Sequence, residues 1–178
     1  KTGQKFPLNR EVRMMDINKE IAEHTTQVEA IITKYLPEES GYQKTVMEAM
    51  NYSFLAGGKR LRPMLMQETY RLFDGSSDII EPFMAAIEMI HTYSLIHDDL
   101  PAMDNDDYRR GRKTTHVVYG EAMGILAGDA LLNFAFETAC KGLMQDVGNP
   151  AVARAVQILA QKAGIYGMLG GQVVDVES

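Results

Sequence analysis

The segment from Pro82 to Ile96 constrains the fold more strongly than any other part of the chain. It reads "PFMAAIEMIHTYSLI", and its apolar residues fall on both faces of a helix rather than along one stripe. A helix that is apolar all round must be covered by neighbouring elements on every side. The sequence therefore predicts that this helix lies in the middle of an assembly of helices.

The rest of the chain carries helical signals and almost no strand signals. No segment shows an alternation of period two bounded by hairpin turns. Apolar spacing and terminal Gly or Pro residues predict further helices at Asp16–Tyr35, Gln43–Ala56, from Arg62–Pro63 to just before "DGSSD", Glu121–Met144 and Ala151–Leu169. Short loops between long helices indicate an all-α bundle, and residues 1–178 are expected to form one helical domain.

Composition argues against several classes of protein. The formal net charge of −6 is unlike that of a general nucleic-acid binder. No stretch approaches the roughly 18 apolar residues of a membrane-spanning helix, and the polar start "KTGQKFPLNREVR" lacks an apolar signal-peptide core. Cys140 is the single cysteine, which excludes a disulfide within one chain. A cytoplasmic location is the simplest expectation.

Charge of one sign is concentrated directly after the apolar segment and then reverses. The stretch "HDDLPAMDNDDYRRGRK" carries five aspartates and then four cations: Asp98, Asp99, Asp104, Asp106 and Asp107, followed by Arg109, Arg110, Arg112 and Lys113. Two carboxylates at ~4 Å repel by about 4 kcal/mol at an effective dielectric of 20, so the cluster needs cations or water. Mg²⁺ commonly sits between carboxylates and phosphates, and guanidinium groups pair with phosphate oxygens. The stretch predicts a Mg²⁺-bridged phosphate or diphosphate.

Pro101 decides whether two of these aspartates can share one ion. On a continuous helix, Asp98 and Asp104 would point ~120° apart because they are six residues apart. Pro101 should end the helix, since it restricts Leu100 and lacks a backbone N–H. We therefore expect Asp98 in the last helical turn and Asp104 on a returning loop that faces the same ion. Asp106 and Asp107 are expected to be solvated loop charges.

The acidic stretch has two other interpretations, a solvated loop and a calcium-binding EF-hand. A solvated acidic loop stays open, although the apolar "HTYSLI" before it places the first aspartates at the mouth of a core. A calcium-binding EF-hand fails, because Arg109 stands where that loop requires Gly and Thr115 where it requires Glu.

A second cationic motif, "AGGKRLRP", places three positive side chains behind a Gly pair at a helix start, where an anion is favoured. It is not a Walker P-loop, since the first Gly of that motif would fall at Ser53. The alternative is a Gly cap followed by exposed basic residues.

His91 lies seven residues before Asp98 on the same helical face, and it is either part of the same cavity or a core histidine. His97 has the same ambiguity.

These motifs together resemble the all-trans polyprenyl diphosphate synthases, most closely the bacterial-type farnesyl diphosphate synthases. The resemblance rests on four segments in order: "GGKRLRP", "HTYSLIHDDLPAMDNDDYRRGRKTTH", "GILAGDALL" and "GGQVVD". It covers most of Leu55 to Asp175. It implies an isoprenoid-synthase-type helical bundle around a central cavity.

The resemblance also implies an activity and a set of site residues. Isopentenyl diphosphate would be condensed with dimethylallyl or geranyl diphosphate, with Mg²⁺ as cofactor, to give farnesyl diphosphate. Asp98 and Asp104 match Mg²⁺ ligands, and Asp99 matches a supporting catalytic position. The matched substrate-binding positions are Lys59, Arg62, His91 and Arg110 for isopentenyl diphosphate, Arg109 for the allylic diphosphate, and Gln172 and Asp175 in a motif that lines the cavity.

The family's product length is set by bulky residues shortly before the first aspartate motif. Tyr93 stands five residues before Asp98, and a large ring there should block a growing chain. This favours the fifteen-carbon product. Geranylgeranyl diphosphate or another short-chain product is the alternative.

The family's second aspartate-rich motif and a further Lys-Thr segment are not among these residues. We therefore expect the chain to be the N-terminal part of a larger domain that is inactive alone, and to form a homodimer as the family usually does. A non-catalytic partner subunit is an alternative, and a terpene cyclase is disfavoured by Lys59 and Arg62, which that class does not need.

Overall fold

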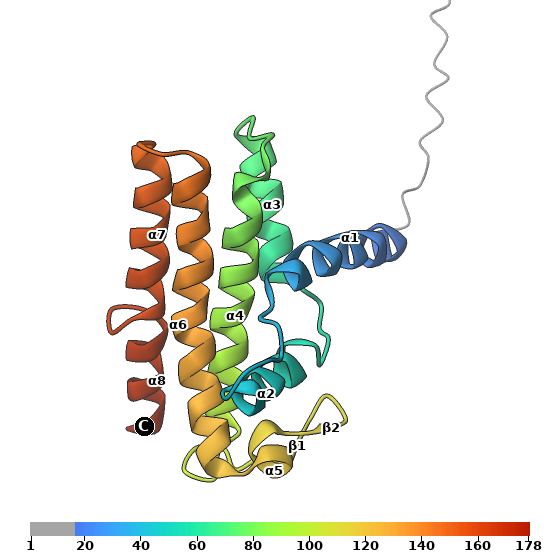
Figure 1. Ribbon diagram of the computed structural model, residues 1–178, viewed down its shortest axis with the longest axis vertical. Helices are drawn as coiled ribbons and strands as arrows, with labels where there is room; N and C mark the ends of the chain where they lie inside the picture. The colour runs from blue at the N-terminus through green and yellow to red at the C-terminus, as the bar shows by residue number, and fades with distance from the viewer. Residues whose placement is uncertain (1–16) are drawn as a thin grey trace, which may run out of the picture.

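The computed structural model describes residues 17–178, and the polar N-terminal stretch and Asp16 lie outside them. The described α-helices are α1 Ile17–Ile32, α2 Lys44–Phe54, α3 Leu61–Leu72, α4 Glu81–Asp98, α5 Thr115–Tyr119, α6 Glu121–Gln145, α7 Pro150–Ala163 and α8 Met168–Val176. Short 3₁₀ helices, η1 Thr33–Tyr35 and η2 Asp78–Ile80, follow α1 and precede α4. The predicted all-α bundle is confirmed (Figure 1).

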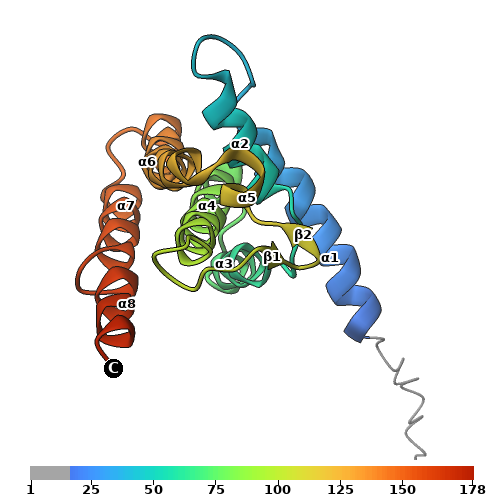
Figure 2. The ribbon, with the colours of Figure 1, turned by 90° about the horizontal axis from the view of Figure 1, so that it is seen from below.

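The helix α4 lies in the middle of the bundle, as its two-sided apolar pattern predicts. It packs along α6 on one side and against α3 on the other, and α1 and α2 also contact it (Figures 1 and 2). Its core residues Met84 and Met89 are fully buried. Because α4 is covered on most sides, its C-terminal end is fixed relative to α2, α3 and α6.

One described segment is long and apolar enough to cross a membrane by length and composition alone. It runs from Asp78 to Asp98, with a mean hydropathy of 1.2, so the expectation that no stretch approaches this limit is wrong as stated. The same test is passed by buried core helices, and 61% of this window is buried inside the fold. Its burial against α6 accounts for its composition.

The helix expected at Ala151–Leu169 is interrupted, which is a second correction. The helix α7 ends at Ala163, and α8 begins at Met168. The N–H of Gly164 donates to the Ala160 carbonyl at 3.1 Å, and at Gly167 a Cβ would lie 2.0 Å from the carbonyl oxygen of Lys162. Only glycine permits this close turn, which the periodicity of apolar residues does not reveal.

A small antiparallel hairpin was not predicted. Its strands are β1 Tyr108–Arg109 and β2 Arg112–Lys113, with Tyr108 opposite Lys113. Arg110 and Gly111 form the turn with φ values of 52° and 77°, the left-handed region that tight two-residue hairpins require. Strands of two residues are too short to show alternation, and Gly111 alone marked the turn in the sequence.

Candidate active site

The aspartates lie at the end of α4, where the chain turns back on itself. The helix ends at Asp98, and the N–H of Asp104 donates to the Asp98 carbonyl oxygen at 2.8 Å. A second return bond joins the N–H of Asp106 to the Asp99 carbonyl at 3.2 Å. The expected turn after Pro101 is therefore present, and it brings Asp104 beside Asp98.

Asp98 and Asp104 form a pair of like charges, and neither carboxylate makes an ion pair with a cation of residues 17–178. Burial raises the pKa of Asp98, and the nearby negative charge of Asp104 raises it further, against a smaller opposing effect of Arg109. The turn is thus electrostatically unfavourable as it stands, and a cation would relieve it. Asp104, Asp106 and Asp107 are exposed.

The donor set fits a hard cation such as Mg²⁺ in part. In residues 17–178, no group of three or more His, Cys, Asp or Glu side chains is gathered closely enough to hold a metal ion. Mg²⁺ is typically bound through one or two carboxylates and keeps other positions for water and phosphate oxygens. Asp98 and Asp104 match that partial coordination, so the described residues could supply one side of a metal site.

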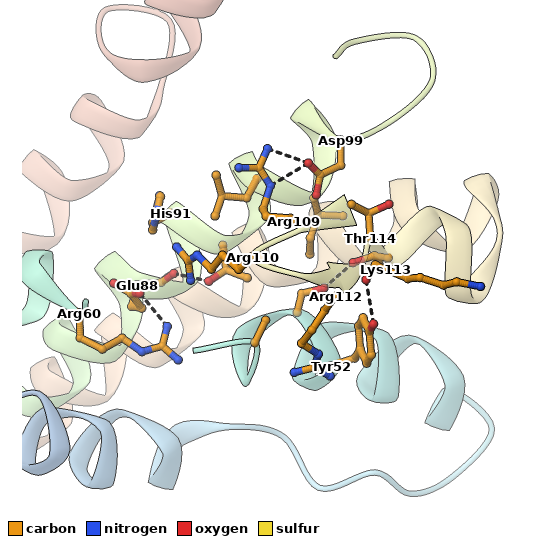
Figure 3. Close-up of a pocket in the computed structure, with 16 residues that line it drawn as sticks. Tyr52, Arg60, Glu88, His91, Asp99, Arg109, Arg110, Arg112, Lys113 and Thr114 are labelled. Atoms are coloured by element: carbon orange, nitrogen blue, oxygen red, sulfur yellow. Dashed lines mark hydrogen bonds and ion pairs between the residues drawn. The ribbon is translucent and has the colours of Figure 1, made fainter. Parts of the chain in front are cut away.

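Asp99 faces the interior and differs sharply from its neighbour. It is 4% exposed, and its Oδ1 accepts a hydrogen bond from Nε of Arg109 and forms an ion pair with Nη2 of the same residue, both at 2.7 Å (Figure 3). The hydrogen bond to Asp99 raises the pKa of Arg109 despite burial. Arg109 is thereby tied to the end of α4, and part of its guanidinium is already used within the chain.

The hairpin that carries Arg109 and Arg110 is held against α2 by Tyr52. The hydroxyl of Tyr52 donates to the Lys113 carbonyl at 2.7 Å, and the Arg112 guanidinium lies 4.4 Å from the centre of the Tyr52 ring. At the turn, Nη1 of Arg110 donates to the carbonyl oxygen of Gly57. A Cβ on Gly58 would lie 2.5 Å from that same Nη1 and would displace the guanidinium, and the φ of 145° at Gly58 also favours glycine.

The hairpin and the loop after α2 enclose a cationic cleft of about 430 Å³. Lys59 lines it from the loop, Arg62 from the first turn of α3, His91 from α4 and Arg110 from the hairpin. The structure therefore brings together, from three segments far apart in the sequence, the residues for which a second anion site is predicted. Its four groups are the ones that the resemblance matches to isopentenyl diphosphate.

The charge of this cleft acts on His91. Burial lowers the pKa of His91 to about 4, and the positive charges of Arg62, Arg110, Arg60 and Arg109 contribute to the shift. The imidazole is therefore neutral at neutral pH and can donate one hydrogen bond. Its position in the cleft answers the question left open by the sequence, since His91 is only partly buried and faces cations rather than apolar core.

Arg60 was not distinguished from the other cations of "KRLR" by the sequence, which predicted either an anion site or exposed basic residues. Its side chain is 1% exposed and pairs with Glu88 of α4 at 2.7 Å (Figure 3) and also with Glu29 of α1. Burial alone would lower the pKa of Arg60, but its hydrogen bonds to Glu29 and Glu88 outweigh that effect and raise it. No sequence signal distinguishes Arg60 from Arg62, because its partners lie 28 and 31 residues away.

An apolar cleft of about 600 Å³ lies between α3, α4 and α7, lined by side chains such as Phe83, Ile87 and Ile158. Ile87, His91 and Asp98 are spaced four and seven residues apart, so they follow one face of α4. Along this face, the acidic turn is followed by the cationic cleft and then by apolar surface.

The other predicted residues lie away from these clefts. Tyr93 is 5% exposed and stands edge-on to His97, with the ring centroids 5.8 Å apart. Gln172 is half-buried and Asp175 exposed on α8, and neither lines the clefts described above. The ring of His97 faces α6, where its Nε2 lies 3.1 Å from the Ile125 carbonyl oxygen.

The sequence pattern of the polyprenyl synthetase family matches residues 43–178. The chain belongs to the polyprenyl synthetase family. Within this family it is 54% identical over 134 residues to the large subunit 1 of a heterodimeric geranylgeranyl pyrophosphate synthase from Arabidopsis thaliana, a match that covers 75% of this chain and 36% of that protein. It is 44% identical over 163 residues to a farnesyl diphosphate synthase from Geobacillus stearothermophilus, covering 92% of this chain and 54% of that one.

Among solved structures, an FPP/GFPP synthase from Zymomonas mobilis matches with a TM-score of 0.82 and 37% identity, over 90% of this chain and 57% of that one. The polyprenyl synthetase fold is thus shared, as a helical isoprenoid-synthase bundle. The chain spans between about a third and just over half of the length of these relatives. The predicted family is confirmed, and the relatives carry the names of synthases with different products.

Proposed function

We propose that the protein to which this chain belongs is a Mg²⁺-dependent short-chain prenyltransferase that makes farnesyl diphosphate from isopentenyl diphosphate and dimethylallyl or geranyl diphosphate. One observation carries the proposal. Asp98, which lies beside Asp104, and His91, which lines the cationic cleft, lie on one face of α4, seven residues or ~10.5 Å apart along the helix. A carboxylate pair suited to a metal ion and a cationic cleft at this spacing suit two diphosphate substrates.

Each group then has a role in binding. Lys59, Arg62 and Arg110 bind and orient the diphosphate of isopentenyl diphosphate, and neutral His91 donates a hydrogen bond to it. Asp98 and Asp104 would hold Mg²⁺, which supplies positive charge to the leaving diphosphate when bound. Asp99 fixes Arg109 at the allylic side.

The reaction needs no reactant besides the allylic diphosphate and isopentenyl diphosphate. The bond between carbon and the diphosphate oxygen of the allylic substrate breaks, and a carbon–carbon bond forms to the double bond of isopentenyl diphosphate. A proton is then lost from the coupled product. Apolar surface near Ile87 suits the hydrocarbon chain, and its exclusion of water protects the cationic carbon from hydrolysis.

The product and the assembly form the finer part of the proposal. Tyr93 as the chain-length residue favours fifteen carbons, whereas the 54% identity to a geranylgeranyl pyrophosphate synthase subunit favours twenty. A homodimer is supported by exposed apolar side chains on the outer face of α5 and α6, at Val118, Ile125 and Leu126. We place the protein in the cytoplasm and residues 1–178 in one larger helical domain that is inactive without its remainder.

Incubation of the full-length protein with isopentenyl and dimethylallyl diphosphates and Mg²⁺ tests the proposal. The expected product, after phosphatase treatment and mass spectrometry, is farnesol, and chelation of the metal should abolish it. No prenyl product, with or without an added partner chain, would refute the enzyme and favour a non-catalytic subunit. A twenty-carbon product would establish the alternative product, and Tyr93→Ala should lengthen whichever product forms.

A further inference from the structure

Arg60 stands between two proposed substrate-binding cations but is not available to bind a substrate. Lys59 and Arg62 are exposed, whereas Arg60 is 3% exposed. A guanidinium has five N–H donors, and four hydrogen bonds from Arg60 end on groups of this chain. Arg60 is therefore distinct in role from its two neighbours, although the three share one short motif.

The partners of Arg60 come from three different helices. Nε and Nη2 bind the carboxylate of Glu29 on α1, with the Nη2 bond at 2.9 Å. Nη2 also donates to the Phe54 carbonyl at the end of α2, and Nη1 donates to Glu88 on α4, both at 2.7 Å. One side chain thus joins the loop to α1, α2 and α4 at the same time.

The backbone of Arg60 has an unfavourable conformation, and the four hydrogen bonds of its side chain offset part of that cost. Its φ of 47° and ψ of 33° place it in the left-handed region, which residues other than Gly enter at a cost. Its carbonyl accepts the N–H of Met64 at 3.1 Å and so begins α3. The conformation sets the direction of Lys59 on the loop relative to Arg62 in the first turn of α3.

Glu88, which accepts a hydrogen bond from Arg60, lies on the same helix as His91. The two residues are three apart on α4 and so lie on neighbouring turns of one face. We propose that Arg60 is a positioning residue that, through Glu29 and Glu88, fixes Lys59 and Arg62 opposite His91 for binding of the isopentenyl diphosphate group. This inference rests on the proposed function and adds the device that aligns its cationic site.

Steady-state kinetics of the full-length Arg60→Lys variant test this role, because Lys keeps the charge but cannot fork between two carboxylates. We expect the KM for isopentenyl diphosphate to rise at least about tenfold, since a small misplacement of binding groups is costly. The KM for the allylic substrate should change by less than about threefold, as should kcat. The matched control is Arg71→Lys, at an exposed Arg on α3 that pairs with Glu68, and its kinetics should equal those of the wild type.

The milder variant Glu29→Gln and a titration with pyrophosphate test the role of Arg60 independently of the Arg60→Lys kinetics. Glu29→Gln retains an oxygen acceptor at the half-exposed partner, and it should raise the same KM by a smaller factor. Calorimetric titration with inorganic pyrophosphate in the absence of metal should show weaker binding to Arg60→Lys than to the wild type. Equal rises in both KM values, or an unchanged KM with a lowered Tm, would overturn the role. Absence of prenyl transfer by the wild type would refute the proposed function instead, and the pyrophosphate titration would still decide on Arg60.

Discussion

Two charged regions at α4 are built in opposite ways. Around Arg60, one cation is buried between two carboxylates, and its hydrogen bonds are nearly complete. At the aspartate turn, Asp98 and Asp104 face each other as like charges, and burial raises the pKa of Asp98. The Arg60 cluster, whose charges are paired within the chain, can position other groups. The Asp98–Asp104 pair, whose charges repel each other, is available to bind a cation.

The largest effect is expected at the unsatisfied region. In the full-length protein, Asp98→Asn should lower kcat for prenyl transfer at least about 10³-fold, because charge stabilisation by a metal is worth several kcal/mol. The free energy of unfolding should stay the same or increase, since the substitution removes repulsion with Asp104. Activity assays and urea unfolding measure the two quantities. A large loss of stability would contradict the prediction, because it would mean that Asp98 stabilises the fold as the Arg60 cluster does.

The satisfied region should respond in the opposite sense. Glu88→Ala leaves Arg60 buried with one carboxylate fewer, and we expect a loss of about 3 kcal/mol in the free energy of unfolding. Glu88→Gln serves as the matched variant, because it keeps an acceptor for Nη1 and should lose less. Equilibrium urea denaturation of the full-length chain gives both values. A loss below about 1 kcal/mol for Glu88→Ala would mean that Arg60 is not held by its ion pairs.

His91 lies between the two regions, and its titration shows to which of them it belongs. The charged groups that line the cationic cleft with it are positive apart from Glu88: Lys59, Arg60, Arg62 and Arg110. NMR titration should give a pKa of about 4 for His91, below its ordinary value of 6.5. Bound pyrophosphate should raise this pKa, because an anion favours the protonated form.

The sign of the stability effect follows from the same shift. Between about pH 4 and 6.5, the unfolded state binds more protons at this histidine than the folded state does, so stability should increase with pH across that window. His91→Gln should flatten this part of the profile. A pKa near 6.5 in the folded protein would place His91 outside the cationic field.

The smallest effect concerns the hairpin that joins the two regions. Tyr52→Phe removes the hydrogen bond to the Lys113 carbonyl but keeps the ring under Arg112. We expect a loss of about 1 kcal/mol in stability, as is typical of one neutral hydrogen bond. Thermal unfolding measures it, and Tyr42→Phe, at a fully exposed tyrosine, is the control. An unchanged Tm would show that the hairpin is held by its arginines alone.

Much of this arrangement could be predicted because it depends on local rules. The period of apolar residues predicted the helices, and Pro101 predicted the turn that places Asp104 beside Asp98. The break between α7 and α8 was missed, since the close contact at Gly167 depends on backbone three-dimensional geometry rather than on periodicity. The hairpin was missed because strands of two residues have no pattern.

The sequence by itself determined that α4 is a buried helix, that it ends in an acidic turn, and that basic residues occur in two motifs. Only the tertiary structure decided which cations are used internally. Arg60 and Arg62 are two residues apart in one motif, and Asp98 and Asp99 are adjacent in the other. Arg60 and Asp99 are buried and form ion pairs, whereas Arg62 is exposed and Asp98 is half-buried. The reason is that the burial of a charge depends on partners brought together from other helices, such as Glu29 and Glu88, and chain order does not encode that proximity.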